Sequence, residues 1–181
     1  EVKTGKIKAI SNLSKTTSNK YAETINLAVS HQIEPGSTFK TASMMAYFED
    51  YIADLNDTID CKNGKYKFKG SPIITNDSKK MQIVSIQKAF ANSSNIGIGR
   101  LIVNHYGSSP NRFVNRLNDF GLTKKSLIDL EGVPTPNINS PNQKNWSGIS
   151  LPWMSFGYGV SLTAIDLLTF YNAIANNGYF L

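Results

Sequence analysis

Two short groups of polar residues in this chain have the types and spacing that covalent acyl transfer requires. The first is Ser37 and Lys40, three residues apart where a long apolar segment begins. A serine hydroxyl is a weak nucleophile until a base takes its proton, and a lysine amine is such a base when burial lowers its pKa toward neutrality. A helix here puts both side chains on one face. The same pattern also fits an ordinary helix start, with Ser37 as the N-cap and Lys40 in solvent.

The second group is Ser93, Ser94 and Asn95, a polar segment between two apolar ones. On a tight turn, the serine hydroxyl can pass a proton between Lys40 and a leaving amine. The asparagine amide can hold a substrate carbonyl and contact Lys40. Taken alone, these residues equally fit a polar loop between helices, with Ser93 or Ser94 as an N-cap.

Other kinds of catalytic site lack support in the sequence. The two histidines, His31 and His105, lie in no motif, and no Gly-x-Ser-x-Gly elbow is present. The single cysteine, Cys61, excludes an internal disulfide framework and a cysteine-based zinc site. We therefore expect neither a metal nor a cofactor.

Composition places the chain among ordinary globular proteins. It has 181 residues, 40% of them hydrophobic and 18% charged, which suits one domain. The net charge of +6 comes from scattered lysines, and the alternating Lys65–Lys69 segment fits a solvated hairpin strand, so we expect no nucleic-acid partner. No apolar run is long enough to span a membrane. The chain begins without Met and ends in an apolar stretch, so we expect it to be a segment of a longer protein.

The periodicity of apolar residues predicts the elements that position these groups. A buried helix is expected to follow Pro35 and Gly36, from Thr38 to Leu55, and Val2–Ile10 is expected to form a hairpin that turns at Lys3–Gly5. The region from Lys124 to Pro152 is rich in proline and predicts a loop. Further helices are predicted at Ser85–Ala91, Ile96–His105, Asn111–Phe120 and Thr163–Asn176.

Several segments resemble one protein family, in order along essentially the whole chain. Glu34–Lys40 (EPGSTFK) resembles the active-serine segment of class B penicillin-binding proteins, the monofunctional peptidoglycan transpeptidases. Ser93–Gly97 (SSNIG) resembles their second motif. Ser155–Thr163 resembles the segment that precedes a later helix of the family, and Lys3–Ile10 resembles its first hairpin.

The family's third motif, Lys-Thr-Gly or Lys-Ser-Gly on a strand, follows the other two. Here the only such tripeptide is Lys3–Gly5, which precedes Ser37 and which we interpret as a hairpin turn. We therefore expect the third motif beyond Leu181. On this interpretation residues 1–181 are part of a single transpeptidase domain without its C-terminal strands, and the chain alone is inactive or weakly active.

The resemblance implies an α+β fold of the penicillin-binding transpeptidase and serine β-lactamase type, incomplete here. The segment would be mostly helical, with the first strands of an antiparallel sheet. It further implies that Ser37 attacks the D-Ala-D-Ala carbonyl of a stem peptide and releases D-Ala. In that reaction Lys40 is the base, Ser93 relays the proton, and Asn95 positions substrate and Lys40.

The resemblance also implies partners and a location. Peptidoglycan stem peptides are the substrates, β-lactam antibiotics acylate Ser37, and cell-wall synthesis proteins are further partners. The reaction takes place on the extracytoplasmic (periplasmic) face of the bacterial membrane, held there by an N-terminal anchor that this chain does not contain. Glu34–Ser37 favours the division-type enzymes over the elongation type.

Two relatives of the same fold remain as alternatives, a serine β-lactamase and a β-lactam-sensing domain. Class D β-lactamases carry valine where this chain has Asn95, and the deacylation motif of class A enzymes is not matched by Glu131–Pro134.

Overall fold

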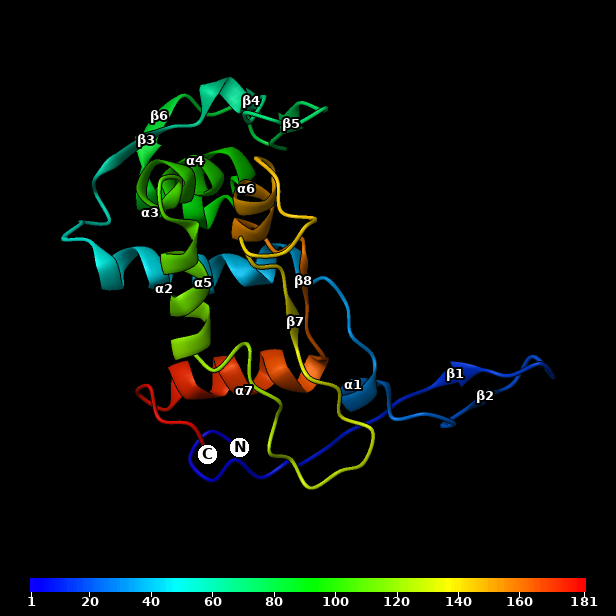
Figure 1. The fold of residues 1–181 in the computed structure, drawn as a ribbon. Coiled ribbons are helices and arrows are strands. Elements are labelled where there is room, and N and C mark those ends of the chain that lie inside the picture. The colour runs from blue at the N-terminus through cyan, green and yellow to red at the C-terminus, as the bar shows by residue number, and fades with distance from the viewer. The chain divides into compact units, whose positions relative to one another are not determined.

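A computed structural model describes all residues from 1 to 181 (Figure 1). The chain forms two compact units. One consists of residues 1–33, 118–137 and 161–181, and the other of residues 34–117 and 138–160. Because the second unit contains Ser37, Lys40, Ser93 and Asn95, it alone supplies every site residue that the sequence predicts.

The second unit is mainly helical, with short strands. Its antiparallel pairs place Ile59 of β3 opposite Val84 of β6, and Tyr66 of β4 opposite Thr75 of β5. β7 and β8 form another pair. In chain order the elements are η1 (a 3-10 helix, Gly36–Phe39), α2 (Lys40–Asp50), β3 (Thr58–Asp60), η2 (a second 3-10 helix, Lys62–Gly64), β4 (Lys65–Tyr66), β5 (Thr75–Asn76), β6 (Ile83–Ser85), α3 (Ile86–Ala91), α4 (Asn95–Tyr106), α5 (Pro110–Asp119), β7 (Asn137–Ile138), α6 (Ser150–Ser155) and β8 (Val160–Ser161).

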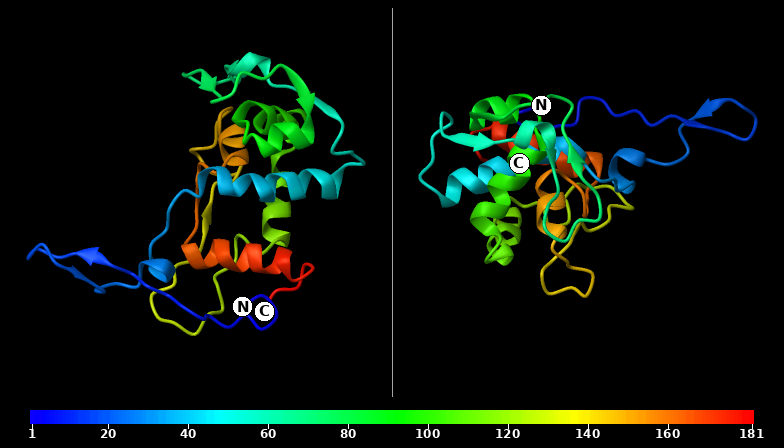
Figure 2. Two further views of the ribbon diagram at one scale, coloured as in Figure 1. Left: turned by 180° about the vertical axis from the view of Figure 1, so that it is seen from behind. Right: turned by 90° about the horizontal axis from the view of Figure 1, so that it is seen from above.

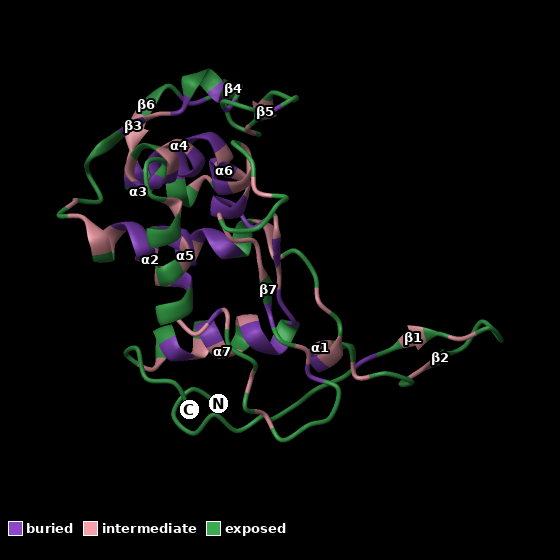
Figure 3. Ribbon diagram, in the orientation of Figure 1, coloured by how far each residue is buried: buried purple, intermediate pink, exposed green.

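Helix α4 is the centre of this unit. It packs against α2, α3 and α6, and Figure 3 shows it largely buried. Its isoleucines Ile96, Ile98 and Ile102 are at most 1% exposed. Glycine is required at position 99, because a Cβ there would lie 2.6 Å from the Phe68 ring. Seven residues of α4 are buried and only Asn104 is exposed, so packing holds the N-terminal end of the helix, which follows directly on Ser93 and Ser94.

The first unit contains β1 (Ser14–Lys15), β2 (Tyr21–Ala22), α1 (Leu27–Ser30) and α7 (Ala164–Ala175). Its β1–β2 hairpin extends away from α1 (Figures 1 and 2). Val29, Val133 and Ile165 form its buried cluster. Helix α7 begins with a capping box in which Thr163 and Asp166 bond each other's backbone N–H groups. None of the chain's helices is long and apolar enough to cross a membrane.

Four of the predicted helices are confirmed. α3, α4, α5 and α7 each lie within two residues of the predicted bounds. The α+β class with short antiparallel strands is confirmed as well. The turn expected at Lys3–Gly5 is present, with the Gly5 N–H donating to the Glu1 carbonyl at 2.9 Å.

Three predictions about elements are wrong in part. The helix expected from Thr38 to Leu55 ends at Asp50, and Ile52 is fully exposed. The hairpin expected at Val2–Ile10 has its turn but no strands, because a strand needs a partner for its backbone groups and none lies beside these residues. Helix α6 begins at Ser150, inside the region expected to be a loop.

Candidate active site

Ser37 lies on a tight 3-10 turn at the surface. Gly36 is the first residue of η1 and adopts a left-handed conformation, with φ of 55°. η1 ends at Phe39, and α2 begins at the next residue, Lys40. In a 3-10 helix, side chains three residues apart lie one above the other, so Ser37 and Lys40 share a side of the turn. Ser37 is exposed. A nucleophile must be open to its substrate, and Ser37 meets that requirement.

Lys40 is buried, with 1% of its surface exposed. Its Nζ donates to the Ser93 carbonyl at 2.5 Å and to Ser93 Oγ at 2.9 Å. Burial lowers the pKa of Lys40 to about 8, and the nearby Asp77 carboxylate acts in the opposite direction. The amine is buried and its pKa lies close to neutral pH. The interpretation of Lys40 as an ordinary solvent-exposed residue is therefore wrong.

The Ser93 turn has an unusual backbone. Ser93 adopts a φ of 52°, in the left-handed region, a conformation that costs a non-glycine residue about 1–3 kcal/mol. Its N–H donates to the Phe90 carbonyl at 2.8 Å. Ser94 is the N-cap of α4, with its Oγ accepting the Gly97 N–H at 2.8 Å. This strained turn points both oxygens of Ser93 at Lys40.

Asn95 is the first residue of α4 and is half-buried. The acceptors of Lys40 Nζ are the two oxygens of Ser93, so no hydrogen bond joins Lys40 to the Asn95 amide or to the Ser37 hydroxyl. The structure thus brings Lys40 and Ser93 into direct contact. Ser37 lies one turn before Lys40, and Asn95 lies two residues after Ser93.

A segment far along the chain holds the turn that carries Ser37. The Gly36 N–H donates to the Gly157 carbonyl at 3.2 Å, and the Gly159 N–H donates to Glu34 Oε1 at 2.9 Å. Position 157 admits only glycine, because a Cβ there would lie 2.1 Å from the Gly36 carbonyl oxygen. The sequence showed the segment Ser155–Thr163 as a resemblance but gave no sign that it touches the turn that carries Ser37.

The family model described as the penicillin-binding protein transpeptidase domain matches residues 1–181. The chain belongs to this family. The resemblance on which the sequence interpretation rests is therefore confirmed.

Curated relatives agree with the family. The chain is 25% identical over 185 residues to the peptidoglycan D,D-transpeptidase FtsI of Escherichia coli K12, covering 99% of the chain and 30% of the relative. It is 26% identical over 153 residues to penicillin-binding protein PbpB of Mycolicibacterium smegmatis, covering 84% of the chain and 23% of the relative. The chain thus spans 23% to 30% of the length of these proteins.

Solved structures share the fold. Penicillin-binding protein 3 of Mycobacterium tuberculosis, complexed with aztreonam, superposes with a TM-score of 0.71 at 27% identity, covering 84% of this chain and 33% of that one. A peptidoglycan glycosyltransferase from Burkholderia ambifaria gives 0.76 at 23% identity, over 86% of this chain and 47% of that one. The predicted fold of the penicillin-binding transpeptidases is confirmed.

Asp77 is the residue of this site that sequence reasoning missed. Its carboxylate accepts hydrogen bonds from Ser94 Oγ, from the Asn95 N–H at 2.8 Å and from the Ile96 N–H at 3.3 Å. It caps a helix from a loop 17 residues before Ser94. Capping patterns are readable only when the cap adjoins its helix, so no local signal marks Asp77.

Proposed function

We propose that this chain carries the nucleophile and the general base of a peptidoglycan D,D-transpeptidase. Ser37 attacks the carbonyl between the two D-Ala residues of a stem peptide, and Lys40 accepts the proton of its hydroxyl. The observation that carries the proposal is the buried Lys40 amine, bonded to Ser93 and one turn from the exposed Ser37.

The pKa of Lys40 suits this role. At about 8, it leaves roughly a tenth of the amine as free base at neutral pH, whereas an ordinary lysine is almost wholly charged. The same amine, once protonated, is acidic enough to return its proton to a leaving group. Ser93 Oγ, 2.9 Å from Nζ, is placed to relay that proton.

The reaction has two balanced steps. First, a bond forms between Ser37 Oγ and the carbonyl carbon while the peptide C–N bond breaks, and D-Ala leaves as an amine carrying the proton delivered through Ser93. Second, the amine of a neighbouring stem peptide forms a C–N bond to the acyl carbon while the ester bond to Ser37 Oγ breaks, and the proton lost by the attacking amine returns to Ser37. The Asn95 amide holds the substrate during both steps.

β-Lactams react with Ser37 in the first step only, because the opened ring keeps its leaving group attached. Penicillin-binding protein A of M. tuberculosis has been solved as acyl-enzyme complexes with ceftriaxone and imipenem, and it shares this fold. We place the reaction at the bacterial cell wall, on the extracytoplasmic side of the membrane and beside other cell-wall synthesis proteins.

Intact-mass spectrometry after incubation with benzylpenicillin tests the proposal on the natural protein that carries this chain. We expect an adduct of one antibiotic mass, absent from Ser37→Ala and formed at least 1000-fold more slowly by Lys40→Met. An adduct that persists in Ser37→Ala, or a wild-type protein that never gains mass, contradicts the proposal. An adduct that disappears within seconds identifies a β-lactamase instead.

A further inference from the structure

The loop that contains Asp77 contacts the Ser93 turn on its C-terminal side. Both oxygens of the Asp77 carboxylate are used, one by Ser94 Oγ and the other by the N–H groups of Asn95 and Ile96. Ser94 is fully buried and Asp77 is half-buried. A charged acceptor that bonds two backbone N–H groups and a hydroxyl at a helix start is a strong restraint on all three.

The same loop also contacts the turn on its N-terminal side. Lys79 Nζ donates to Asn92 Oδ1 at 2.6 Å, and Asn92 Nδ2 donates to the Lys88 carbonyl at 2.8 Å. The residue before Ser93 and the residues after it are therefore tied to one loop. The loop is itself anchored, since the Asp77 N–H donates to the Gly64 carbonyl at 3.0 Å.

Ser93 needs support of this kind because its left-handed backbone, with φ of 52°, is not its own preference. The contact of 2.5 Å between Lys40 Nζ and the Ser93 carbonyl depends on that conformation. If the turn relaxed to negative φ, the carbonyl would rotate and the buried amine would lose an acceptor.

We propose that the loop Asp77–Lys79 is a clamp that holds the Ser93 turn against Lys40, and that Asp77 is a positioning residue of the active site. The clamp grips the turn from both ends and leaves both oxygens of Ser93 directed at the Lys40 amine. This inference rests on the proposed function for its catalytic meaning, but the clamp itself is a physical arrangement that can be measured without substrate.

The negative charge of Asp77 also affects the pKa of Lys40. The Asp77 carboxylate favours the charged form of Lys40, which opposes the effect of burial. Two other titratable groups lie beside the turn: the Lys79 amine, which donates to Asn92 Oδ1, and the Cys61 thiol, which is 3.5 Å from Ser94 Oγ and whose pKa is raised by burial. Asp77 thus limits how far the pKa of Lys40 falls, and removal of its charge lowers that pKa further.

The first experiment needs no antibiotic and follows the ¹³Cε resonance of Lys40 with pH, together with amide exchange at Asn95 and Ile96. Asp77→Asn keeps the shape but removes the charge, so we expect the pKa of Lys40 to fall. Asp77→Ala also removes the acceptor, so both amides exchange at least 10-fold faster. Lys80→Gln, beside the clamp, should change neither quantity. An unchanged pKa and unchanged exchange in both Asp77 variants overturn the inference.

The second experiment measures the rate of acylation by a fluorescent penicillin between pH 6 and pH 10, with the unfolding midpoint of each variant recorded. In Asp77→Asn the rising limb of the profile moves to lower pH. In Lys79→Gln the rate drops about 3-fold to 10-fold, while Lys80→Gln matches wild type.

If the acylation rates merely follow the fraction of folded protein and the rising limb of the pH profile does not move, Asp77 is a structural residue only and the inference is wrong. If wild type is not acylated, the proposed function fails, and the first experiment still decides the clamp.

Discussion

Lys40 is under two opposing requirements. To act as a base it must lose its proton near neutral pH, and burial supplies that by disfavouring the charged form. To remain in place it needs acceptors, and the Ser93 oxygens supply those. A buried amine of this kind costs stability in exchange for reactivity, which is common where a site is tuned for chemistry.

This cost predicts a pH dependence for Lys40→Met. The pKa of Lys40 is about 8 in the folded chain against an ordinary value of 10.5, so between these values the unfolded chain binds more protons. Wild-type stability should therefore rise with pH across this window relative to Lys40→Met, by at most about 1.4 kcal/mol per pH unit, and the difference should be constant below it. Urea unfolding from pH 7 to pH 10.5 measures it, with Lys67→Met as the exposed control. A difference that is flat throughout contradicts the shift.

Gly157 offers a second test at the scale of one residue. In Gly157→Ala the new methyl group collides with the Gly36 backbone, 2.1 Å from its oxygen, and φ is 91°. We expect a loss of about 3 kcal/mol or more in the free energy of unfolding and slower acylation of Ser37. Gly178→Ala is the matched control, because its φ is 88° and no atom lies within 4 Å. It should cost only about 1 kcal/mol, and equal losses in the two variants would show that contact with Gly36 is unimportant.

Residue types and spacing made Ser37, Lys40, Ser93 and Asn95 candidates, and the resemblance to the family favoured a catalytic interpretation over an ordinary helix start and a polar loop. Ser37 and Lys40 were accessible to sequence reasoning because one helical turn joins them. Ser93 and Asn95 were recognisable only through their order relative to Ser37. Asp77 was not recognisable from the sequence, because its hydrogen-bond partners lie on another element and its own neighbours are ordinary polar loop residues.

At the scale of elements, prediction succeeded where the signal is local. α3, α4, α5 and α7 follow from apolar periodicity and polar or glycine boundaries. The end of α2 was misjudged because Ile52 and Leu55 continue its apolar spacing but face solvent. The strands are only two or three residues long, too short for alternation to be read, and their partners are set by tertiary contacts.

The start of α4 gives a prediction at this scale. Ser94→Ala removes the N-cap and the hydroxyl donor to Asp77, so we expect a loss of about 1–2 kcal/mol in stability together with slower acylation. Ser85→Ala removes the N-cap of α3 and should cost about 1 kcal/mol with acylation unchanged. Denaturant titration and penicillin labelling of both variants separate these outcomes. Equal acylation rates in Ser94→Ala and Ser85→Ala would mean that the Ser94 cap only stabilises α4.

At the scale of the whole molecule, the order of the motifs along the chain predicted the family. The sequence did not predict the division into two units. The family interpretation used segments from both units, from Lys3–Ile10 to Ser155–Thr163. One unit collects three separated stretches of chain. Such an association depends on contacts between residues far apart in the sequence, and no periodicity within a window reports them.

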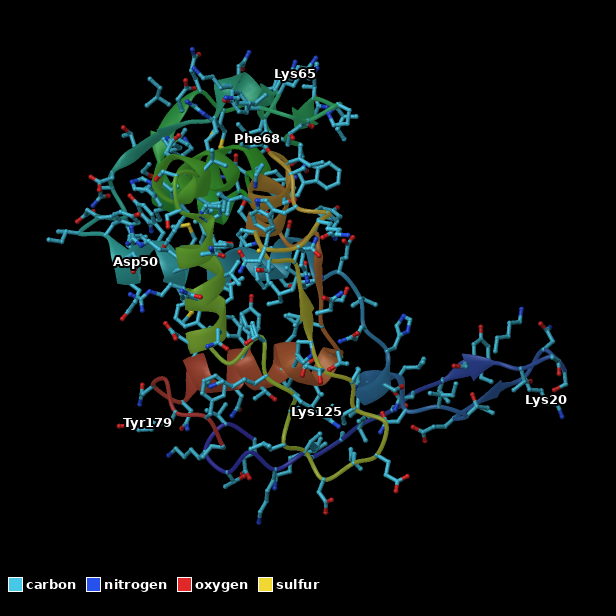
Figure 4. All side chains as sticks on the ribbon, viewed as in Figure 1. Lys20, Asp50, Lys65, Phe68, Lys125 and Tyr179 are labelled. Atoms are coloured by element: carbon cyan, nitrogen blue, oxygen red, sulfur yellow. The ribbon has the colours of Figure 1, made fainter.

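The unit that holds the site depends on a charge network at the end of α2. The side chain of Asp50, labelled in Figure 4, is 7% exposed, and its carboxylate accepts from Arg116 Nη2 at 2.6 Å and from the Tyr106 hydroxyl at 2.7 Å. These bonds join α2, α4 and α5. The Arg116 guanidinium and then the Tyr106 hydroxyl hold the pKa of Asp50 below its ordinary value, in spite of burial.

Asp50→Asn should therefore weaken the whole unit in a pH-dependent way. At pH 7 the variant loses the charged acceptor of the Arg116 hydrogen bond, and we expect a loss of about 2 kcal/mol. The stabilisation that wild type gains from the carboxylate is complete above the ordinary pKa of 3.8 and disappears as pH falls through the lowered value. The two proteins should thus converge in stability as pH is lowered from 4 toward 2. Unfolding by urea across this range measures the convergence. A gap that stays constant would mean that Asp50 acts through packing and hydrogen-bond geometry, and that its charge contributes nothing to holding α2, α4 and α5 together.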